Sequence, residues 1–409
     1  MNSRQLTLIL VVAIVLGAIG WVLFHRDAGA WHSQTTASRD KVIDFPLNDV
    51  AQITITDGTG ELNLVNKPQG WVVGERSDYP ANFEQVSRFL QKVWNLKPIE
   101  TLQVGPSQFA RFELTEPAKD TKGGTLLDLK NKDGKRITAL LIGKQYFRKE
   151  NENFGLAKIP AGRYVMPEDG SKHVFLIADP LQDLLIKPER WLNRDFVKIG
   201  KPKSIALEGT TPTEKWKIQR DAESADWKFA DAMPNEVLDS ARAAGLAASV
   251  VNMNFVDVLD PNAKPDITGL DHPSTVTIEN FDGFTYTLHI GKLSDDKYPV
   301  TLSVAADLPA QRTAGPNEKA EDKKKLDDAF ATREKGLQAK LTKEKAFEGR
   351  PFLINKLTIT QLLKSRAALV KAEPSPSPSA PASAAAPKIP MKLSKPTPAK
   401  ARVTPKPKS

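Results

Sequence analysis

One series of sequence features occurs twice between residues 49 and 371, and it constrains the fold more than any other property of the chain. In the first copy, two stretches of alternating apolar and polar residues precede Gly70–Val73 and a helical pattern that follows Asn82. In the second copy, Lys215–Arg220 alternates in the same way, Asp226–Phe229 resembles the tryptophan-containing stretch, and a helical pattern again follows. Alternation with a period of two predicts β-strands, and apolar spacings of three and four predict helices.

The two predicted helices carry apolar residues on one face, which we expect to be buried. Asn82 is a suitable N-cap for the first helix, and Pro234-Asn235 stands at the corresponding place before the second. Trp71 and Trp227 are interpreted as core residues. The predicted inward-facing residues are Phe83, Val86, Phe89, Leu90 and Val93 in the first copy, and Val237, Leu238, Ala241, Leu246 and Val250 in the second.

Further correspondences follow each helix. Asp133-Gly134 and Asp282-Gly283 are typical of tight hairpin turns between strands. The return strands end in Gly143-Lys144 and Gly291-Lys292, and we interpret these pairs as turn residues. None fits a phosphate-binding loop, which needs an earlier glycine and a following serine or threonine.

Each copy is expected to end in a short helix, at Leu181–Leu185 and at Ile359–Leu363. Each unit therefore has the order strand–strand–strand–helix–hairpin–hairpin–short helix. This order predicts an α+β fold made of two copies of a mainly antiparallel sheet-plus-helix unit. The predicted boundaries are 49–200 for the first repeat and 201–371 for the second.

The chain begins with an uncharged apolar run, Leu6–Phe24, which is close to the roughly 20 residues needed to cross a bilayer as a helix. We predict an N-terminal membrane anchor with its flank at 1–30, a linker at 31–48, and a soluble part on the periplasmic side of the inner membrane. Ala28–Ala30 also has the form of a signal-peptide cleavage site, so removal of the segment is the alternative. The residues assigned to the anchor are Leu6, Leu10, Ile14, Ile19, Trp21 and Phe24.

A charged stretch at 317–347 interrupts the second repeat. Leu326, Phe330, Leu337 and Leu341 form a sparse apolar stripe within it, which predicts a solvated helix that projects from a hairpin. Two interpretations remain open for this helix: an exposed lobe without a partner, or an arm that docks on one.

The stretch 372–409 is rich in proline, alanine and lysine and is predicted to be a disordered tail. Its seven basic residues account for most of the net charge of +9, so the rest of the chain is close to neutral. The charge therefore does not indicate a nucleic-acid-binding protein. Two interpretations of the tail remain open: a solubilising segment without a specific partner, which we favour, and a segment that binds anionic lipid or cell-wall polymer.

Candidate chemistry is sparse. The chain has no cysteine, which excludes disulfides, cysteine–zinc sites and thiol nucleophiles. It has five histidines, and their spacing does not suit a zinc site. The carboxylates are scattered, so we assign no catalytic, cofactor-binding or metal-binding residues and expect no enzymatic activity.

From about Asp49 to Val370, and more clearly in the first copy, the chain resembles an uncharacterised bacterial family, a domain-of-unknown-function group with one N-terminal membrane helix and a tandem α+β repeat. The motifs that carry the resemblance are Trp71–Val73, Tyr79–Asn82, Phe112–Pro117, Asp133-Gly134, Ile142–Lys144 and Trp191–Arg194. Such proteins are often associated with ABC-type exporters and with gliding-motility-type auxiliary proteins. The resemblance implies a non-enzymatic interaction module in a transport or cell-envelope complex. A membrane-to-cell-wall linker and an envelope enzyme with an unrecognised site are the alternatives.

Overall fold

A computed structural model describes residues 41–371, apart from 120–122, 148–158, 185, 212–213 and 316–317. The predicted anchor, with Leu6, Leu10, Ile14, Ile19, Trp21 and Phe24, lies outside the described residues, as does the tail at 372–409. Among the helices that are described, none has both the length and the apolar character needed to span a bilayer.

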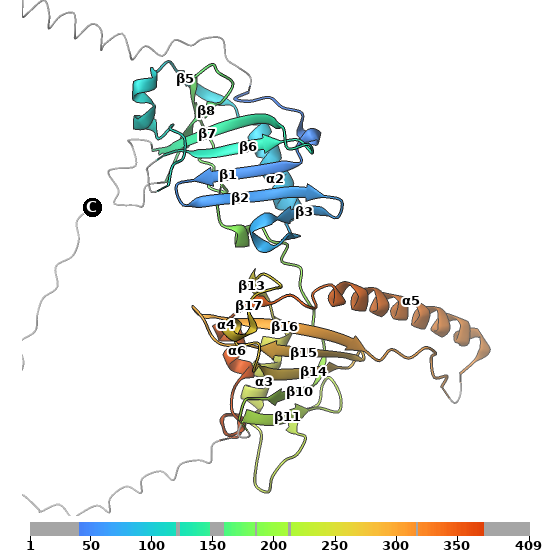
Figure 1. The fold of residues 1–409 in the computed structure, drawn as a ribbon. Coiled ribbons are helices and arrows are strands. Elements are labelled where there is room, and N and C mark those ends of the chain that lie inside the picture. The colour runs from blue at the N-terminus through green and yellow to red at the C-terminus, as the bar shows by residue number, and fades with distance from the viewer. Residues whose placement is uncertain are drawn as a thin grey trace, which may run out of the picture. The chain divides into compact units, whose positions relative to one another are not determined.

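The described part of the first repeat forms one antiparallel sheet with a helix across it (Figure 1). In sheet order its strands are β4 (Tyr79–Pro80), β3 (Gly70–Val73), β2 (Gly60–Lys67), β1 (Gln52–Asp57), β6 (Thr125–Lys130), β7 (Arg136–Tyr146), β8 (Gly162–Pro167), β9 (Val174–Ile177) and β5 (Pro98–Leu102). The helix α2 (Phe83–Trp94) connects β4, at one end of this order, to β5 at the other.

The described part of the second repeat has the same sheet order, except that it has no strand equivalent to β4. Its strands are β12 (Lys228–Phe229), β11 (Lys215–Gln219), β10 (Pro202–Glu208), β14 (Ser274–Asn280), β15 (Phe284–Ile290), β16 (Lys297–Ala306), β17 (Phe352–Asn355) and β13 (Phe255–Val258). The helix α3 (Ser240–Val251) connects the two ends of this sheet, as α2 does in the first. The second repeat also contains α4 (Pro265–Thr268), α5 (Ala320–Lys345) and α6 (Lys356–Leu362). The predicted α+β class with two mainly antiparallel sheets is confirmed.

The helix α2 begins where the sequence predicts. The side chain of Asn82 accepts a hydrogen bond from the backbone N–H of Gln85 at 3.0 Å, which satisfies one of the free amides of the first turn. Val86, Phe89, Leu90 and Val93 are buried against the sheet. The prediction for Phe83 is wrong, because its side chain is 67% exposed.

The predicted start of the second helix is also wrong. The N-cap of α3 is Asp239, whose carboxylate accepts hydrogen bonds from the N–H groups of Ala241 and Arg242 at 2.9 and 3.1 Å. Asn235 instead adopts a left-handed conformation with φ of 66°, and Val237 precedes the helix and is 59% exposed. Because the Asp239 carboxylate caps two backbone amides, α3 begins at Ser240, downstream of Pro234-Asn235.

The short helix expected at Leu181–Leu185 is absent from the described residues of that stretch, which form a turn. Leu181 has a φ of 48°, and its N–H donates to the side chain of Asp179 at 2.7 Å. A left-handed residue at this place prevents a right-handed helix from starting there. In the second repeat α6 occupies the expected region and begins at Lys356, before Ile359.

The two repeats also close in the same way. Near the end of each repeat the chain passes beside the residue that precedes the N-cap of the long helix. This pairing forms the isolated bridges Ala81–Leu192 and Leu238–Val370. In the first repeat the N–H of Asn82 donates to the carbonyl of Trp191 at 2.7 Å, and in the second the N–H of Asp239 donates to that of Leu369 at 2.9 Å. Both acceptor residues are fully buried. The duplication therefore extends to individual hydrogen bonds.

Gly143 and Gly291 are needed for close approach of the backbone, which corrects their interpretation as turn residues. A Cβ added at Gly143 would lie 2.2 Å from the carbonyl oxygen of Phe112. A Cβ added at Gly291 would lie 2.2 Å from that of Thr268. In each repeat a short helical segment thus packs its backbone directly against the return strand, a contact that only glycine allows.

We predict that Gly143→Ala lowers the free energy of unfolding by about 1–3 kcal/mol, because the added methyl group displaces packed backbone. Gly245→Ala is the matched control, since Gly245 lies inside α3 with nothing within 4 Å of the added atom. The control should raise stability by about 0.5–1 kcal/mol. Chemical denaturation of the two variants provides the measurement, and equal effects would contradict the packing argument.

Candidate interaction surfaces

An arginine–carboxylate pair connects the two repeats. Arg76 follows β3, and its Nε and Nη2 atoms donate to the two carboxylate oxygens of Asp257 in β13 at 2.7 and 2.9 Å. Asp257 is only 8% exposed, and Glu189 lies 3.7 Å from the same guanidinium. The hydrogen bond to Asp257 is the largest cause of the raised pKa of Arg76. A bidentate pair of this kind fixes the orientation of the guanidinium relative to the carboxylate as well as the distance between them.

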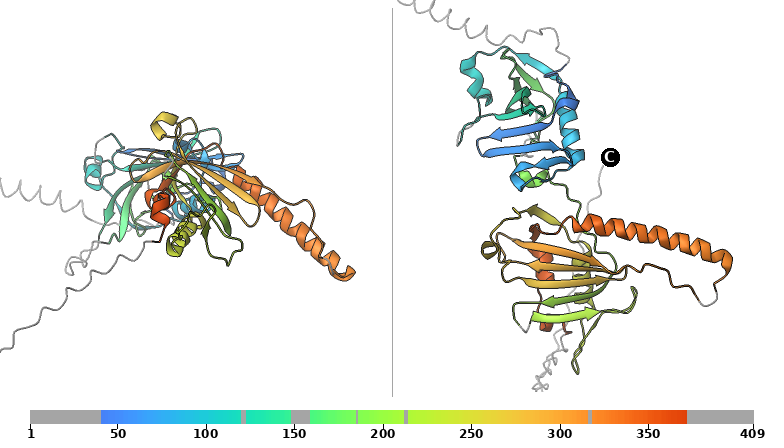
Figure 2. Two further views of the ribbon diagram at one scale, coloured as in Figure 1. Left: turned by 90° about the horizontal axis from the view of Figure 1, so that it is seen from below. Right: turned by 45° about the vertical axis from the view of Figure 1, so that its right-hand side comes forward.

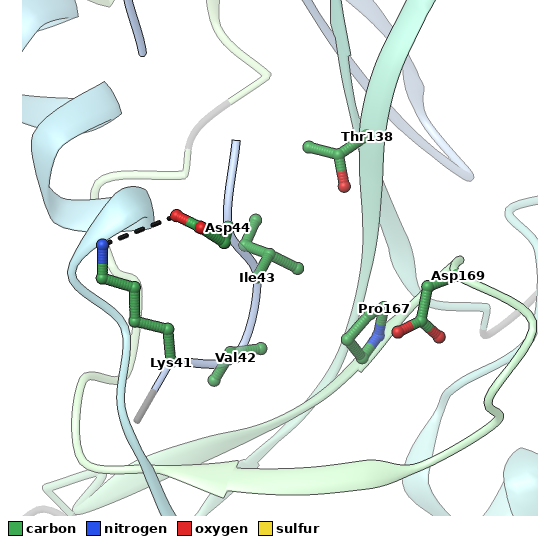
Figure 3. Close-up of a pocket in the computed structure, with 7 residues that line it drawn as sticks. All are labelled: Lys41, Val42, Ile43, Asp44, Thr138, Pro167 and Asp169. Carbon is green, nitrogen blue, oxygen red and sulfur yellow. Dashed lines mark ion pairs between the residues drawn. The ribbon is translucent and has the colours of Figure 1, made fainter. Parts of the chain in front are cut away.

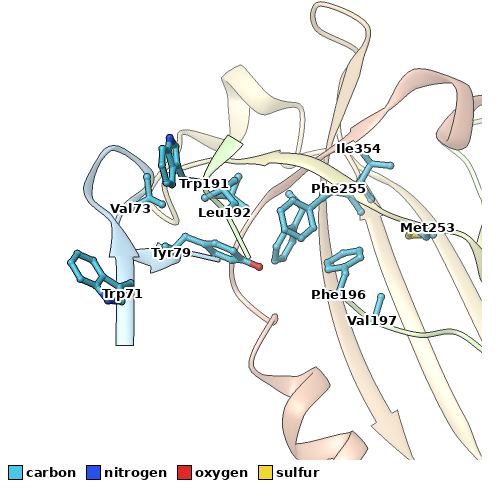
Figure 4. Packing of buried hydrophobic residues seen from close by; sticks show 14 of the residues in the cluster. Trp71, Val73, Tyr79, Trp191, Leu192, Phe196, Val197, Met253, Phe255 and Ile354 are labelled. Carbon is cyan, nitrogen blue, oxygen red and sulfur yellow. The ribbon is translucent and has the colours of Figure 1, made fainter. Parts of the chain in front are cut away.

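Aromatic side chains of the two repeats are also in contact, and Figure 4 draws Tyr79, Phe196 and Phe255 among the buried residues. The ring of Tyr79 is 5.7 Å from that of Phe255 and 6.1 Å from that of Phe352, both in edge-to-face geometry. Phe196, from the segment that links the repeats, is 4.8 Å from Phe352. Burial raises the pKa of Tyr79 to about 12.

Arg350 adds further contacts between the repeats. Its guanidinium donates to the backbone carbonyls of Arg76 and Ser77 at 2.9 and 3.1 Å, and it lies over the ring of Tyr79. We call this set of contacts the junction; its residues are Arg76, Ser77, Tyr79, Phe196, Phe255, Asp257, Arg350 and Phe352.

The charged insertion forms α5, which extends away from the second sheet in both views of Figure 2. Its C-terminal end is fixed by Glu344, whose side chain is 3% exposed. One carboxylate oxygen accepts from the backbone N–H of Lys198 at 2.8 Å, and the other accepts from the hydroxyl of Tyr286 at 2.8 Å. Burial, followed by this hydrogen bond, raises the pKa of Tyr286. The base of α5 therefore joins the second sheet to the segment between the repeats.

The rest of α5 makes few contacts with the sheets. Arg333 pairs with Asp282 at 2.6 Å, in the turn between β14 and β15. Before Arg333 the helix has exposed polar side chains, and its largest exposed apolar residue is Leu326 at 44%. We call residues 321–332 the arm. Within the arm, Asp327 pairs with Arg312 of the preceding segment at 2.8 Å. A helix that is fixed at its base and otherwise largely solvated is suited to presenting a surface to another molecule.

The hollow drawn in Figure 3 has a volume of about 430 Å³. It is lined by Lys41, Val42, Ile43, Asp44, Thr138, Pro167 and Asp169. Two of these residues are carboxylates, but the side chain of Asp44 is 81% exposed and lies 3.6 Å from Lys41. A general acid needs a less solvated setting than this.

No group of histidine, aspartate and glutamate side chains suited to a metal ion occurs among the described residues. His289 lies 3.3 Å from the hydroxyl of Thr275 on the outer face of the second sheet. His272 is close to Asp271 on the surface, with its side chain 89% exposed. The structure therefore brings none of these histidines together.

The comparison with protein families gives one match. Residues 71–273 match the family described as a domain of unknown function, DUF4340. The match begins in β3 of the first repeat and ends just before β14 of the second, so it does not coincide with one structural repeat. No curated protein and no solved structure matches the chain.

We predict that Tyr79 makes the junction sensitive to alkaline pH. A tyrosine in an unfolded chain titrates near pH 10, whereas the pKa of Tyr79 is raised to about 12 in the fold. The buried, neutral phenol of Tyr79 therefore makes its full contribution to the free energy of unfolding below pH 10. This contribution is lost as the pH rises from 10 to about 12. The expected loss is about 2–3 kcal/mol in the free energy of unfolding.

The matching variant is Tyr79→Phe, which cannot ionise and should lose less stability across this range. Denaturation curves recorded between pH 8 and pH 12 give the comparison. The same alkaline loss in the variant and the parent would show that Tyr79 is not the titrating group.

Proposed function

We propose that this protein is a non-enzymatic interaction module, anchored in the inner membrane through Leu6–Phe24 and located in the periplasm. In this proposal it is an auxiliary of an ABC-type transport or cell-envelope complex. The apolar N-terminal run and the family resemblance support the location and the type of complex. The interaction role is supported by one structural observation above all, the fixed base and solvated arm of α5.

The base of α5 explains why the arm would be effective in binding. Glu344 is buried, each of its carboxylate oxygens accepts one hydrogen bond, and Lys340 lies 3.9 Å away, so losing either hydrogen bond would leave a buried charge only partly compensated. The arm is therefore held in one direction relative to the second sheet before any partner arrives. Pre-organisation of this kind reduces the entropy that is lost on binding.

The arm also carries a suitable contact surface. Leu326 is exposed, and Phe330 follows it by one helical turn on the same face. Lysine and aspartate residues flank the two apolar side chains. An apolar stripe with charged edges is the usual form of a helix that lies in a groove on its partner.

The experiment is recovery of partners with the full-length chain in mild detergent, with Leu326→Glu as the test variant. The parent should retain a permease and an ATPase in comparable amounts, and Leu326→Glu should reduce their recovery at least tenfold. Leu357→Glu is the matched control, because Leu357 is 76% exposed in α6 and lies outside the arm. Unchanged recovery with Leu326→Glu would overturn the role of the arm.

A membrane-to-cell-wall linker is the second candidate, and the composition of the tail favours it. Seven basic residues and no acidic residue occur between Pro374 and Ser409. Such a segment is attracted to anionic polymer in a salt-dependent manner. Deletion of 374–409 should abolish association with purified cell wall under this hypothesis, and full retention would exclude it.

A further inference from the structure

A long insertion distinguishes the second repeat from the first. Residues 307–351 separate β16 from β17, whereas only residues 168–173 separate the equivalent strands β8 and β9. The chain returns from this insertion to its sheet through the base of α5. This base comprises the last turns of the helix and the residues that follow it, 340–350.

The base of α5 binds both backbone polar groups of Lys198, in the segment that links the repeats. The side chain of Lys340 donates to the carbonyl oxygen of Lys198 at 2.8 Å. One turn later, the carboxylate of Glu344 accepts from the N–H of Lys198 at 2.8 Å. Because two successive turns of one helix hold the same residue, the linking segment cannot slide along α5 without breaking both hydrogen bonds.

Two further contacts hold the linking segment. Lys343 forms an ion pair with Asp195, and the ring of Phe347 is 5.5 Å from that of Phe196. The side chain of Lys343 is 58% exposed, so its ion pair contributes little by itself. The buried carboxylate of Glu344 and the ring contact are therefore the stronger restraints on this segment.

The base of α5 also contacts each repeat directly. Glu348 accepts a hydrogen bond from the backbone N–H of Val304, in β16, at 2.7 Å. Two residues later, Arg350 donates to the backbone carbonyls of Arg76 and Ser77 in the first repeat. One short stretch of chain thus touches the second sheet, the linking segment and the first repeat.

Two units that are joined by a single segment usually move relative to each other unless a large apolar interface prevents it. We propose that the base of α5 is a clamp that sets the orientation of the two repeats, acting together with the junction. The insertion has this role in addition to presenting the arm. Every contact that carries the inference lies within the described chain, so the clamp does not depend on a partner of the arm.

The clamp and the arm are parts of one helix, which gives the clamp a consequence for the proposed complex. The arm keeps one direction relative to the first repeat as well as to the second sheet, because Arg350 and the linking segment are both held at its base. A partner that tilted the arm would therefore change the angle between the repeats. This consequence, unlike the clamp itself, rests on the proposed function.

The experiment measures the distance between two spin labels, and the absence of cysteine from the chain makes introduced thiols the only labelling sites. Ile99→Cys labels the first repeat and Leu357→Cys labels the second, and both parent side chains are exposed. In the full-length chain in mild detergent, pulsed electron resonance should give one narrow distance distribution. Glu344→Ala should widen this distribution at least twofold, because the linking segment loses its buried acceptor.

The second variant combines Lys340→Ala with Lys343→Ala, which remove two restraints without removing a buried carboxylate, and it should also widen the distribution. The matched control combines Lys324→Ala with Lys325→Ala. These two lysines lie in the arm of the same helix, where both are exposed, and their loss should leave the distribution unchanged.

Glu344→Ala decides the question if it keeps the circular dichroism spectrum of the parent, and otherwise the Lys340 and Lys343 variant decides it. An unchanged distribution in the deciding variant would overturn the clamp, and so would equal widening in the control. The recovery of partners with Leu326→Glu is measured separately. Failure of the clamp and failure of the proposed complex can therefore be told apart.

Discussion

The pairing of Arg76 with Asp257 is the interaction on which the arrangement of the described chain depends. It joins the end of one sheet to the opposite end of the next, and Asp257 is too buried to be left without a cation. Tyr79 places its ring among the phenylalanines beside the pair, which removes apolar surface from water at the same place. Charge and apolar burial thus fix the two repeats together.

The base of α5 extends this arrangement towards the proposed partner. Phe196 belongs both to the junction and to the packing around Phe347, directly after α5. Lys198, two residues further, donates its backbone N–H to Glu344. The direction of the arm and the contact between the repeats therefore depend on the same short segment. A change at the junction would be expected to reach the arm through that segment.

Much of the fold could be predicted from local patterns in the sequence. Strict alternation in stretches such as Lys215–Gln219 identified strands, and the Asn82 cap placed the start of α2. The matching landmarks identified the duplication. The errors occurred where a single residue decides the local structure. Asp239 caps α3 later than expected, and the left-handed backbone of Leu181 gives a turn where a helix was expected.

The features that matter most for the proposed interactions could not be predicted in this way. The strands β5 and β13 are short and do not alternate clearly, so they were missed, although each forms an end of its sheet. Arg76 and Asp257 are far apart in the sequence and are typical surface residues by type. Only the three-dimensional arrangement of the repeats brings them together. Gly143 likewise has an ordinary appearance in the sequence, and its role depends on the carbonyl of Phe112.

The most direct test of the account is a double-mutant cycle between Arg76 and Asp257. The free energy of unfolding would be measured for the parent, Arg76→Ala, Asp257→Ala and the double variant. If the pair fixes the repeats together, the two single effects should exceed the double effect by a coupling energy of about 1–3 kcal/mol. A coupling energy indistinguishable from zero would contradict the account, because the two repeats would then be held together without this contact.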